Sequence, residues 1–183
     1  KLIADKHNEV SVLFADIVEF TPQSQNLNPK ELVSILNSIF THFDDLSTKY
    51  NIEKIKTIGD NYFAVAGLQS SGRKSAIDLI NMAKDMISTI NNINDGLSVM
   101  NVSLRVGIHT GPIVAGVIGK NKFAYDLWGA TVNKASRMEY SGDKNKIQIS
   151  SETYNLIKED FEVLEKRKVD IKGIGATETY IIR

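Results

Sequence analysis

Residues 52–68 read IEKIKTIGDNYFAVAGL, and this stretch decides the fold. Ile52–Ile58 and Tyr62–Leu68 each have the apolar and β-branched composition typical of a strand. Between them lies Gly59-Asp60-Asn61, whose residue types are a strong signal for the tight turn of a β-hairpin. We therefore expect two antiparallel strands joined by that turn.

Strand and helix signals surround the hairpin. An upstream strand is expected over Val10–Val18, which is an apolar run. A helix follows, because Asn28 suits an N-cap, Pro29 the first turn and Glu31 a capping box. This helix should end near Tyr50. The remaining expected elements are a helix capped by Ser71, strands at Val102–His109, Ile113–Ile118 and Ile147–Ser150, helices at Thr131–Tyr140 and Glu152–Glu159, and a mostly β tail over Phe161–Ile182.

The order strand, helix, hairpin, helix, strand predicts an α+β fold with a ferredoxin-like βαββαβ core and a C-terminal α/β extension. Its helices should cover one face of the sheet and leave the other face for a partner or a ligand. The chain has 183 residues and no evident linker or repeat, so 1–183 is expected to form a single domain. Residues 1–8 are interpreted as the end of a connector from an upstream region.

Composition narrows the classes of function. Hydrophobic residues make up 42% and charged residues 24%, so a packed core is expected. Basic and acidic residues balance at 22 each, which argues against a general nucleic-acid binder. The chain has no cysteine and no apolar run of the roughly 18–20 residues that span a bilayer. We expect a cytoplasmic location, and an upstream sensor or membrane region stays open.

Two carboxylates lie where a cation could bind. Asp16 interrupts an apolar strand, and Asp60 lies at the tip of the hairpin. If the two strands are neighbours, both side chains reach one edge of the sheet, and two carboxylates plus substrate phosphates commonly hold magnesium. The alternative is that Asp60 is only a turn residue and Asp16 a strand-end cap. Spacing alone does not decide between these interpretations.

The segment that follows this strand has backbone N–H groups that could cradle a phosphate beside the cation. Its candidate contacts are Ile17, Val18, Phe20 and Thr21. The chain does not contain a Walker loop, because Gly119-Lys120-Asn121 lacks both the Ser or Thr and the upstream glycine of that motif. A P-loop NTPase is therefore excluded.

Further polar residues are candidates for contacting a polyanionic ligand. Asn133 and Arg137 are four residues apart and would share one face of a helix. Lys56 alternates with isoleucines and is expected to face away from the core. Lys172 lies beside glycines that allow close approach of the backbone. For each of them the alternative is an ordinary solvated side chain.

Taken together, these segments resemble the class III adenylyl and guanylyl cyclases, and the similarity spans nearly the whole chain. Five motifs in the expected order and spacing make the resemblance specific. They are Phe14-Ala15-Asp16-Ile17-Val18, Lys56-Thr57-Ile58-Gly59-Asp60, Arg105-Val106-Gly107-Ile108-His109-Thr110-Gly111, Tyr125-Asp126-Leu127-Trp128-Gly129-Ala130-Thr131-Val132-Asn133 and Ala135-Ser136-Arg137-Met138.

The resemblance implies an adenylyl cyclase, which converts ATP to 3′,5′-cyclic AMP and pyrophosphate. Asp16, Ile17 and Asp60 would hold two divalent ions, Mg²⁺ or Mn²⁺. These ions would assist an in-line attack of the ribose 3′-OH on the α-phosphate.

The resemblance also assigns the remaining contacts with ATP. Asn133 would orient the ribose, Arg137 would stabilise the transition state at the α-phosphate, and Lys172 would neutralise the terminal phosphates. Lys56 and Asp126 would bind the base, with the carboxylate accepting from the adenine amino group and the ammonium donating to N1. Charge type alone does not exclude GTP, but relatives that make cyclic GMP typically carry Glu and Cys at these two positions.

Members of this family work as dimers, in which each site takes metal carboxylates from one chain and its other residues from the second chain. The resemblance therefore implies a homodimer with two equivalent sites. Two positions depart from the family pattern: Glu19, where glycine is common, and Pro112, where one half of the mammalian pseudodimer has a phosphate-binding arginine. The open alternatives are a guanylyl cyclase and a catalytically silent nucleotide-sensing or dimerisation domain.

Overall fold

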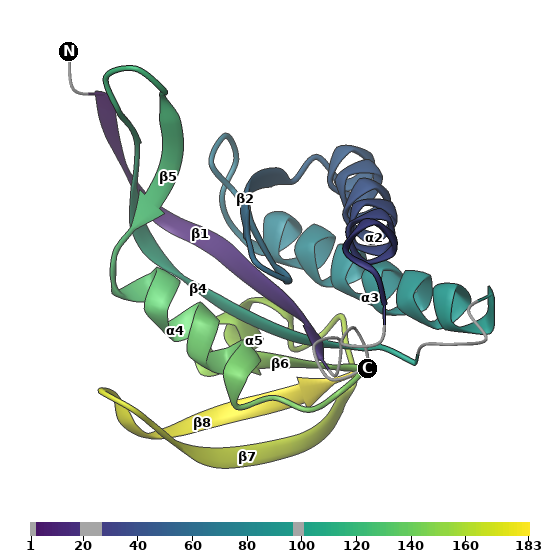
Figure 1. The fold of residues 1–183 in the computed structure, drawn as a ribbon. Coiled ribbons are helices and arrows are strands. Elements are labelled where there is room, and N and C mark those ends of the chain that lie inside the picture. The colour runs from purple at the N-terminus through teal and green to yellow at the C-terminus, as the bar shows by residue number, and fades with distance from the viewer. Residues whose placement is uncertain (1–2, 19–26, 97–100) are drawn as a thin grey trace.

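The computed structural model describes residues 3–18, 27–96 and 101–183 (Figure 1). The predicted phosphate contacts Phe20 and Thr21, and the departure at Glu19, lie outside these residues. In chain order the elements are β1 (Ile3–Val18), α2 (Pro29–Tyr50), β2 (Glu53–Ile58), β3 (Asn61–Ala66), α3 (Arg73–Gly96), β4 (Ser103–Ile118), β5 (Ala124–Trp128), α4 (Ala130–Tyr140), β6 (Lys146–Ser150), α5 (Ser151–Ile157), β7 (Val163–Ile171) and β8 (Gly175–Ile182).

The strands form one sheet in the order β2-β3-β1-β4-β6-β8-β7, and β5 pairs with β4 off this path. The pairs β2–β3, β3–β1 and β1–β4 are antiparallel, which makes the expected βαββαβ core with α2 and α3 as its helices. Strand β6 continues the sheet in parallel with β4, and the β7–β8 hairpin completes the extension. The predicted α+β fold is therefore confirmed.

Helix α2 starts and stops where its sequence dictates. The Asn28 side chain accepts from the backbone N–H of Glu31 at 2.9 Å, and the Glu31 carboxylate accepts from the N–H of Asn28 at 3.2 Å. This capping box satisfies N–H groups that have no partner within the helix. At the other end Asn51 adopts a left-handed conformation with φ of 56°, which ends the helix.

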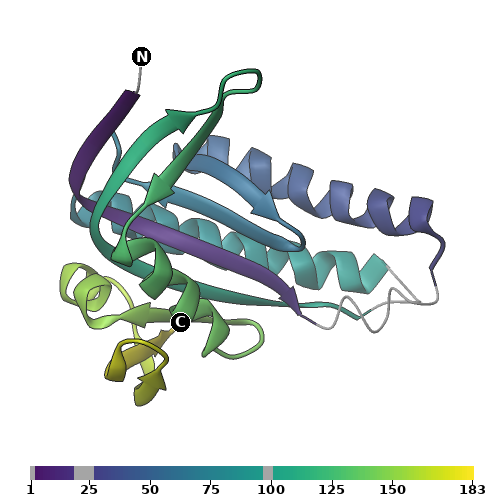
Figure 2. The ribbon, with the colours of Figure 1, turned by 60° about the vertical axis from the view of Figure 1, so that its left-hand side comes forward.

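The main core lies between the sheet and helices α2 and α3, which Figures 1 and 2 show packed along one side of β1 and β4. In the last part of β1 the alternate residues Leu13, Ala15 and Ile17 point into this core. Phe43 of α2 meets Tyr62 of β3 edge to face, with ring centroids 5.5 Å apart. These contacts fix the strands that carry the candidate carboxylates.

The opposite face of the sheet is not left free, which corrects the prediction that only one face would carry helices. Helix α4 lies across it, and Ala135 joins a second apolar cluster with Val12 and Phe14 of β1. Gly107 of β4 lets the helix lie directly on the strand, because a Cβ atom there would come within 1.9 Å of the backbone nitrogen of Glu139. Only glycine permits this approach.

The second half of the sheet differs from the expectation in two ways. One strand, β4, runs from Ser103 to Ile118 in place of two strands separated at Pro112. The proline is accommodated because the partner strand β1 shifts register between His7 and Val10, so no ladder hydrogen bond is required there. Strand β5 was not predicted, since it has five residues and only Leu127 is buried.

The N-terminal segment that was interpreted as the end of a connector is part of the sheet. Ile3–His7 pairs in antiparallel register with Ile113–Val117 of β4. No helix in the described part of the chain combines the length and apolar character needed to cross a membrane.

Candidate active site

The two predicted metal carboxylates lie together at one end of the sheet. Antiparallel pairing of β1 with β3 sets Asp16 opposite Asn61, the residue that follows Asp60 in the hairpin turn. The N–H of Ile17 donates to the carbonyl oxygen of Asp60 at 3.1 Å, which ties the turn to β1. The condition on which the sequence interpretation depended, that the two strands are neighbours, is met.

The environment of Asp16 is strongly unfavourable to a lone negative charge. Burial, followed by the negative charges of Glu139 and Asp60, raises the pKa of Asp16 to about 7, against a smaller opposing effect of Arg105. A divalent cation would relieve this repulsion, and carboxylate oxygens are the ligands that Mg²⁺ and Mn²⁺ prefer. The residues present therefore fit a divalent ion. No group of three or more His, Asp or Glu side chains able to hold a metal occurs among the described residues.

Ile17 and Val18 were predicted to offer backbone N–H groups to a phosphate. The N–H of Ile17 is already used by the Asp60 carbonyl, so it is not available for a phosphate in this conformation. Val18 pairs with Ser103 as the last residue of β1. The N–H group of Ile17, the first one predicted for the phosphate cradle, is thus used to hold the hairpin turn against β1.

Sequence reasoning missed two charged residues beside Asp16. Arg105 lies opposite Asp16 on β4, and its Nε donates to the Glu139 carboxylate at 2.8 Å. The second oxygen of Glu139 accepts from the amide nitrogen of Asn61 at 3.2 Å. A signal for Glu139 was present, since it falls four residues after the buried Ala135 on the inner face of α4.

Asn133 and Arg137 lie on the face of α4 that points away from the sheet. The buried residues of the helix are Thr131, Ala135, Met138 and Glu139. At about 100° per residue, positions 133 and 137 fall on the opposite side. Within the described ranges, no hydrogen bond or ion pair joins either side chain to the two aspartates. One chain therefore holds the predicted reaction residues in two separate groups.

Lys56 and Asp126 are brought into direct contact although 70 positions separate them. The Lys56 ammonium lies 2.6 Å from the Asp126 carboxylate, whose other oxygen accepts from the N–H of Leu127 at 2.8 Å. A register shift in β2 between Lys54 and Lys56 explains the orientation. Lys54 pairs with Asp44 of α2 on one face, and the shift turns Lys56 to the other face, toward β5.

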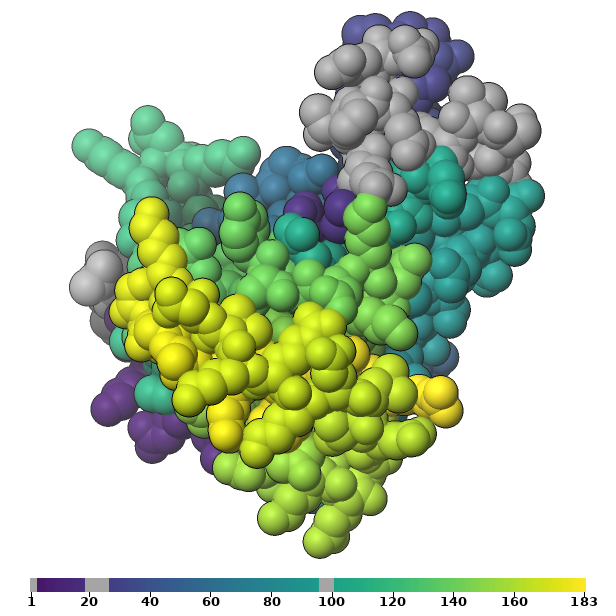
Figure 3. Space-filling view, turned by 90° about the horizontal axis from the view of Figure 1, so that it is seen from below, coloured from purple at the N-terminus to yellow at the C-terminus, as the bar shows by residue number. Residues whose placement is uncertain are grey.

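Lys172 occupies the turn between β7 and β8 and is exposed. The turn depends on Gly173 and Gly175, whose φ angles of 82° and 92° favour glycine. Figure 3 shows the β7–β8 hairpin in yellow across the near side of the molecule. The structure does not bring Lys172 to the other predicted residues, so its role stays a prediction.

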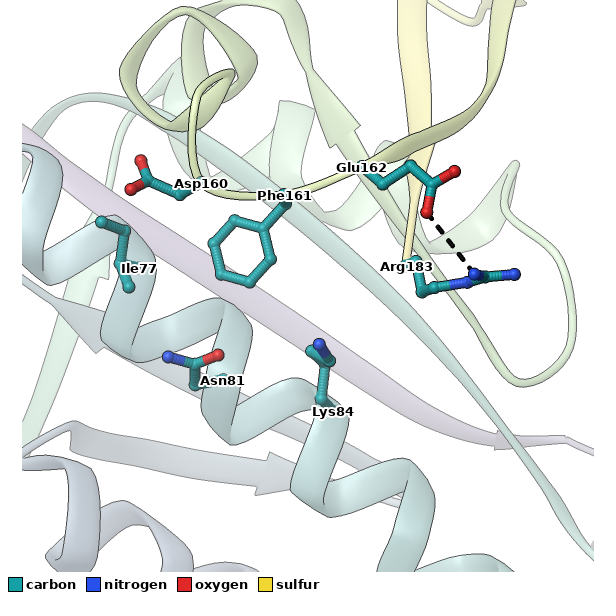
Figure 4. A pocket seen from close by; sticks show the side chains of 7 residues that line it. All are labelled: Ile77, Asn81, Lys84, Asp160, Phe161, Glu162 and Arg183. Atoms are coloured by element: carbon teal, nitrogen blue, oxygen red, sulfur yellow. Dashed lines mark hydrogen bonds and ion pairs between the residues drawn. The ribbon is translucent and has the colours of Figure 1, made fainter.

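A surface pocket of about 480 Å³ lies elsewhere, between α3 and the turn before β7 (Figure 4). It is lined by Ile77, Asn81, Lys84, Asp160, Phe161, Glu162 and Arg183. None of these residues belongs to the predicted site. This pocket is thus not where the candidate chemistry lies.

The fold is that of a nucleotidyl cyclase domain. Residues 2–183 match the family described as the adenylate and guanylate cyclase catalytic domain. The match covers nearly the whole chain, and the chain therefore belongs to this family.

Individual relatives include both types of cyclase. An adenylate cyclase of Mycobacterium tuberculosis (strain ATCC 25618 / H37Rv) is 40% identical over 181 residues, which cover 99% of this chain and 41% of the relative. The adenylyl cyclase CyaB from P. aeruginosa has a TM-score of 0.91 at 26% identity, covering 100% and 96% of the two chains. The guanylate cyclase domain of RhGC from Catenaria anguillulae, solved in complex with GTP, has a TM-score of 0.90 at 31% identity, covering 98% of each. The chain spans about two fifths of the length of its mycobacterial relative.

Proposed function

We propose that this domain is an adenylyl cyclase that converts ATP to 3′,5′-cyclic AMP and pyrophosphate at sites shared by two copies of the chain. The observation that carries the proposal is the contact of 2.6 Å between Lys56 and Asp126. This pair presents one donor and one acceptor side by side, which suits N1 and the amino group of adenine. Charge type alone would also permit guanine, but relatives that make cyclic GMP typically carry Glu and Cys at these two positions. The 40% identity to a mycobacterial adenylate cyclase supports the same choice.

The chain's own residues supply positioning and charge. Asp16 and Asp60 would hold the divalent ions, which when bound supply Lewis-acid stabilisation of the reacting oxygens. Arg137 binds the α-phosphate as negative charge builds, and Asn133 orients the ribose. The bond from the 3′-oxygen to the α-phosphorus forms, and the bond to the β-phosphate oxygen breaks. The hydroxyl proton passes to solvent, and Lys172 neutralises the departing pyrophosphate.

The geometry of α4 supports a composite site. Because Asn133 and Arg137 face away from the sheet that holds Asp16, they are suited to reach the aspartates of a second copy. The β4–β5 hairpin, which projects from the body in Figures 1 and 3, also presents apolar surface to a partner. Its exposed large apolar residues are Val114, Ile118, Phe123, Tyr125 and Trp128.

The first test measures cyclic product from ATP and from GTP with Mn²⁺. We expect faster turnover of ATP. Faster turnover of GTP would make the domain a guanylyl cyclase. Bound ATP with no product from either nucleotide would refute the cyclase proposal and favour a silent nucleotide-binding domain.

The second test mixes two inactive variants, Asp60→Ala and Arg137→Ala. Each alone should be inactive, and in a mixed dimer one site regains a complete set of residues. Random pairing of equal amounts should restore about one quarter of the wild-type activity, because half of the dimers are mixed and each has one intact site. A mixture as inactive as its components would refute the shared site.

A further inference from the structure

Arg105 lies between two carboxylates and hydrogen-bonds to only one of them, while it forms a longer ion pair with the other. Its Nε is 2.8 Å from Glu139, whereas its nearest nitrogen is 3.8 Å from Asp16, which is too long for a hydrogen bond. The guanidinium is also held over the ring of Tyr140, 5.5 Å from the ring centroid. Both anchoring residues belong to α4. The arginine is therefore drawn toward the helix and away from β1.

Glu139 reaches Arg105 because the helix lies so close to the strand. Gly107 and Arg105 are two residues apart on β4 and thus on the same face. The missing side chain at Gly107 lets the backbone of α4 approach at Glu139. The Glu139 side chain is only 5% exposed, and a buried ion pair of this kind seldom adds net stability. A role in function accounts for such a pair better than stability does.

We infer that Glu139 is a positioning residue that restrains Arg105, so that the oxygens of Asp16 stay available for a divalent cation. This inference rests on the proposed function. An arginine released from Glu139 would swing to Asp16 and form the charge-assisted bond that such pairs prefer. Its guanidinium would then compete with the cation for the same oxygens. Through Asn61, Glu139 also fixes the residue next to Asp60.

The experiment measures Mn²⁺ binding to the full chain by calorimetry, without nucleotide. Glu139→Gln should weaken Mn²⁺ binding about tenfold, as is common when a residue behind a metal ligand is removed. The matched double variant, Glu139→Gln with Arg105→Gln, removes the competitor and should bind within about threefold of wild type. Asp60→Ala shows how much Mn²⁺ binding remains when one of the two metal carboxylates is missing. A double variant that binds no better than the single variant would overturn the inference.

A second measurement distinguishes loss of the restraint on Arg105 from the mere loss of the negative charge of Glu139. In wild type, the Arg105 Nε–H should exchange slowly with solvent by NMR, with or without Mg²⁺. In Glu139→Gln the slow exchange should persist through a new bond to Asp16 and be lost when Mg²⁺ is added. Slow exchange in this variant that Mg²⁺ leaves unchanged would contradict the model. So would rapid exchange throughout, since the arginine would then not bond to Asp16.

The mixed dimer shows which site Glu139 serves. In a mixture of Asp60→Ala and Arg137→Ala chains, the Arg137→Ala chain supplies the aspartates of the one complete site. Glu139→Gln added to that chain should raise the Mn²⁺ concentration for half-maximal activity about tenfold. Added to the Asp60→Ala chain, it should change that concentration less than twofold. Equal shifts from both placements would overturn the inference in favour of a general effect on α4.

Failure of this inference is distinguishable from failure of the proposed function. If wild type binds Mn²⁺ no better than Asp60→Ala and also forms no cyclic product from Mn-ATP, both are wrong. If wild type binds and Glu139→Gln is unaffected, only the inference is wrong. Should Glu139→Gln fail to fold, Arg105→Met with Glu139→Met replaces both partners by apolar groups, which buried ion pairs often tolerate. That variant should bind Mn²⁺ within about threefold of wild type, and a larger loss would overturn the inference.

Discussion

Replacing Gly107 by alanine tests the close packing of α4 on β4. A Cβ at this position would lie 1.9 Å from the Glu139 nitrogen and 2.4 Å from the Met138 carbonyl carbon. Ordinary contacts begin near 3.4 Å, so the helix backbone must move by roughly 1.5 Å. Backbone atoms cannot rotate out of the way as the end of a side chain can. The whole helix, with Asn133 and Arg137 on it, must therefore be displaced.

Two effects of this displacement can be measured. Overpacking should lower the free energy of unfolding by about 1–3 kcal/mol, which corresponds to a fall in Tm of about 2–4 °C per kcal/mol. A displacement of about 1 Å in groups that position a substrate can cost roughly 100-fold in rate. We therefore expect kcat/KM with Mn-ATP to fall about 100-fold while the protein stays folded. Thermal unfolding and product formation should be followed on the same preparation.

The control is Gly111→Ala on the same strand. Its Cβ would meet the hydroxyl oxygen of Thr131 at 2.5 Å, so the clash is with a side chain of α4 and not with its backbone. We expect this variant to lose less than tenfold in kcat/KM. If Gly107→Ala retains wild-type activity and Tm, α4 is not held against β4 as described, and the link from Glu139 to Arg105 loses its structural basis.

Four further predictions concern single groups. Lys56→Glu with Asp126→Cys should shift the ratio of ATP to GTP turnover toward GTP, and an unchanged ratio in a folded dimer would refute the base contacts. Arg137→Ala should lower the rate about 100- to 1,000-fold in a steady-state assay. Since the pKa of Asp16 is raised to about 7, a proton competes with the cation for this carboxylate below that pH. The Mn²⁺ affinity measured by calorimetry should therefore fall by up to about tenfold per pH unit below 7 and level off above 7. Equal affinities at pH 5.5 and 7.5 would contradict this. Burial lowers the pKa of His109 from 6.5 to about 4. Below pH 6.5 the unfolded chain therefore takes up a proton that the native chain does not. The free energy of unfolding should be retained above pH 6.5 and should decline by up to about 1.4 kcal/mol per pH unit between pH 6.5 and 4. In denaturant titrations His109→Asn should flatten this decline.

Local patterns in the sequence were enough to find the strand and the turn that carry the two aspartates, but not the pairing that brings them together. The strand around Asp16 and the turn at Asp60 are each defined by their immediate neighbours, and both formed where expected. The capping box of α2 is local in the same sense. The central part of the core could therefore be predicted because its signals lie within a few residues of one another.

Contacts that depend on distant elements could not be predicted from spacing. The ion pair of Lys56 and Asp126 joins β2 to β5. Its formation requires a bulge in β2, and no residue type in this strand indicates a bulge. The resemblance to known cyclases supplied that pair. The link between Arg105 and Glu139 is also tertiary, since it depends on α4 lying against Gly107.

Helix α4 gains a particular importance in the proposed dimer. Its inner face holds Glu139, which acts on the aspartates of its own chain, while its outer face holds Asn133 and Arg137, which serve the site completed by the partner. One rigid helix therefore contributes to both sites of the dimer. A change in one chain that moves α4 as a body, as in Gly107→Ala, should impair both sites, whereas Glu139→Gln in one chain should impair cation binding at one. The mixed dimer can tell these outcomes apart, because only one of its sites is complete. Gly107→Ala should lower its activity when placed in either chain, whereas Glu139→Gln should raise the Mn²⁺ requirement only when placed in the Arg137→Ala chain.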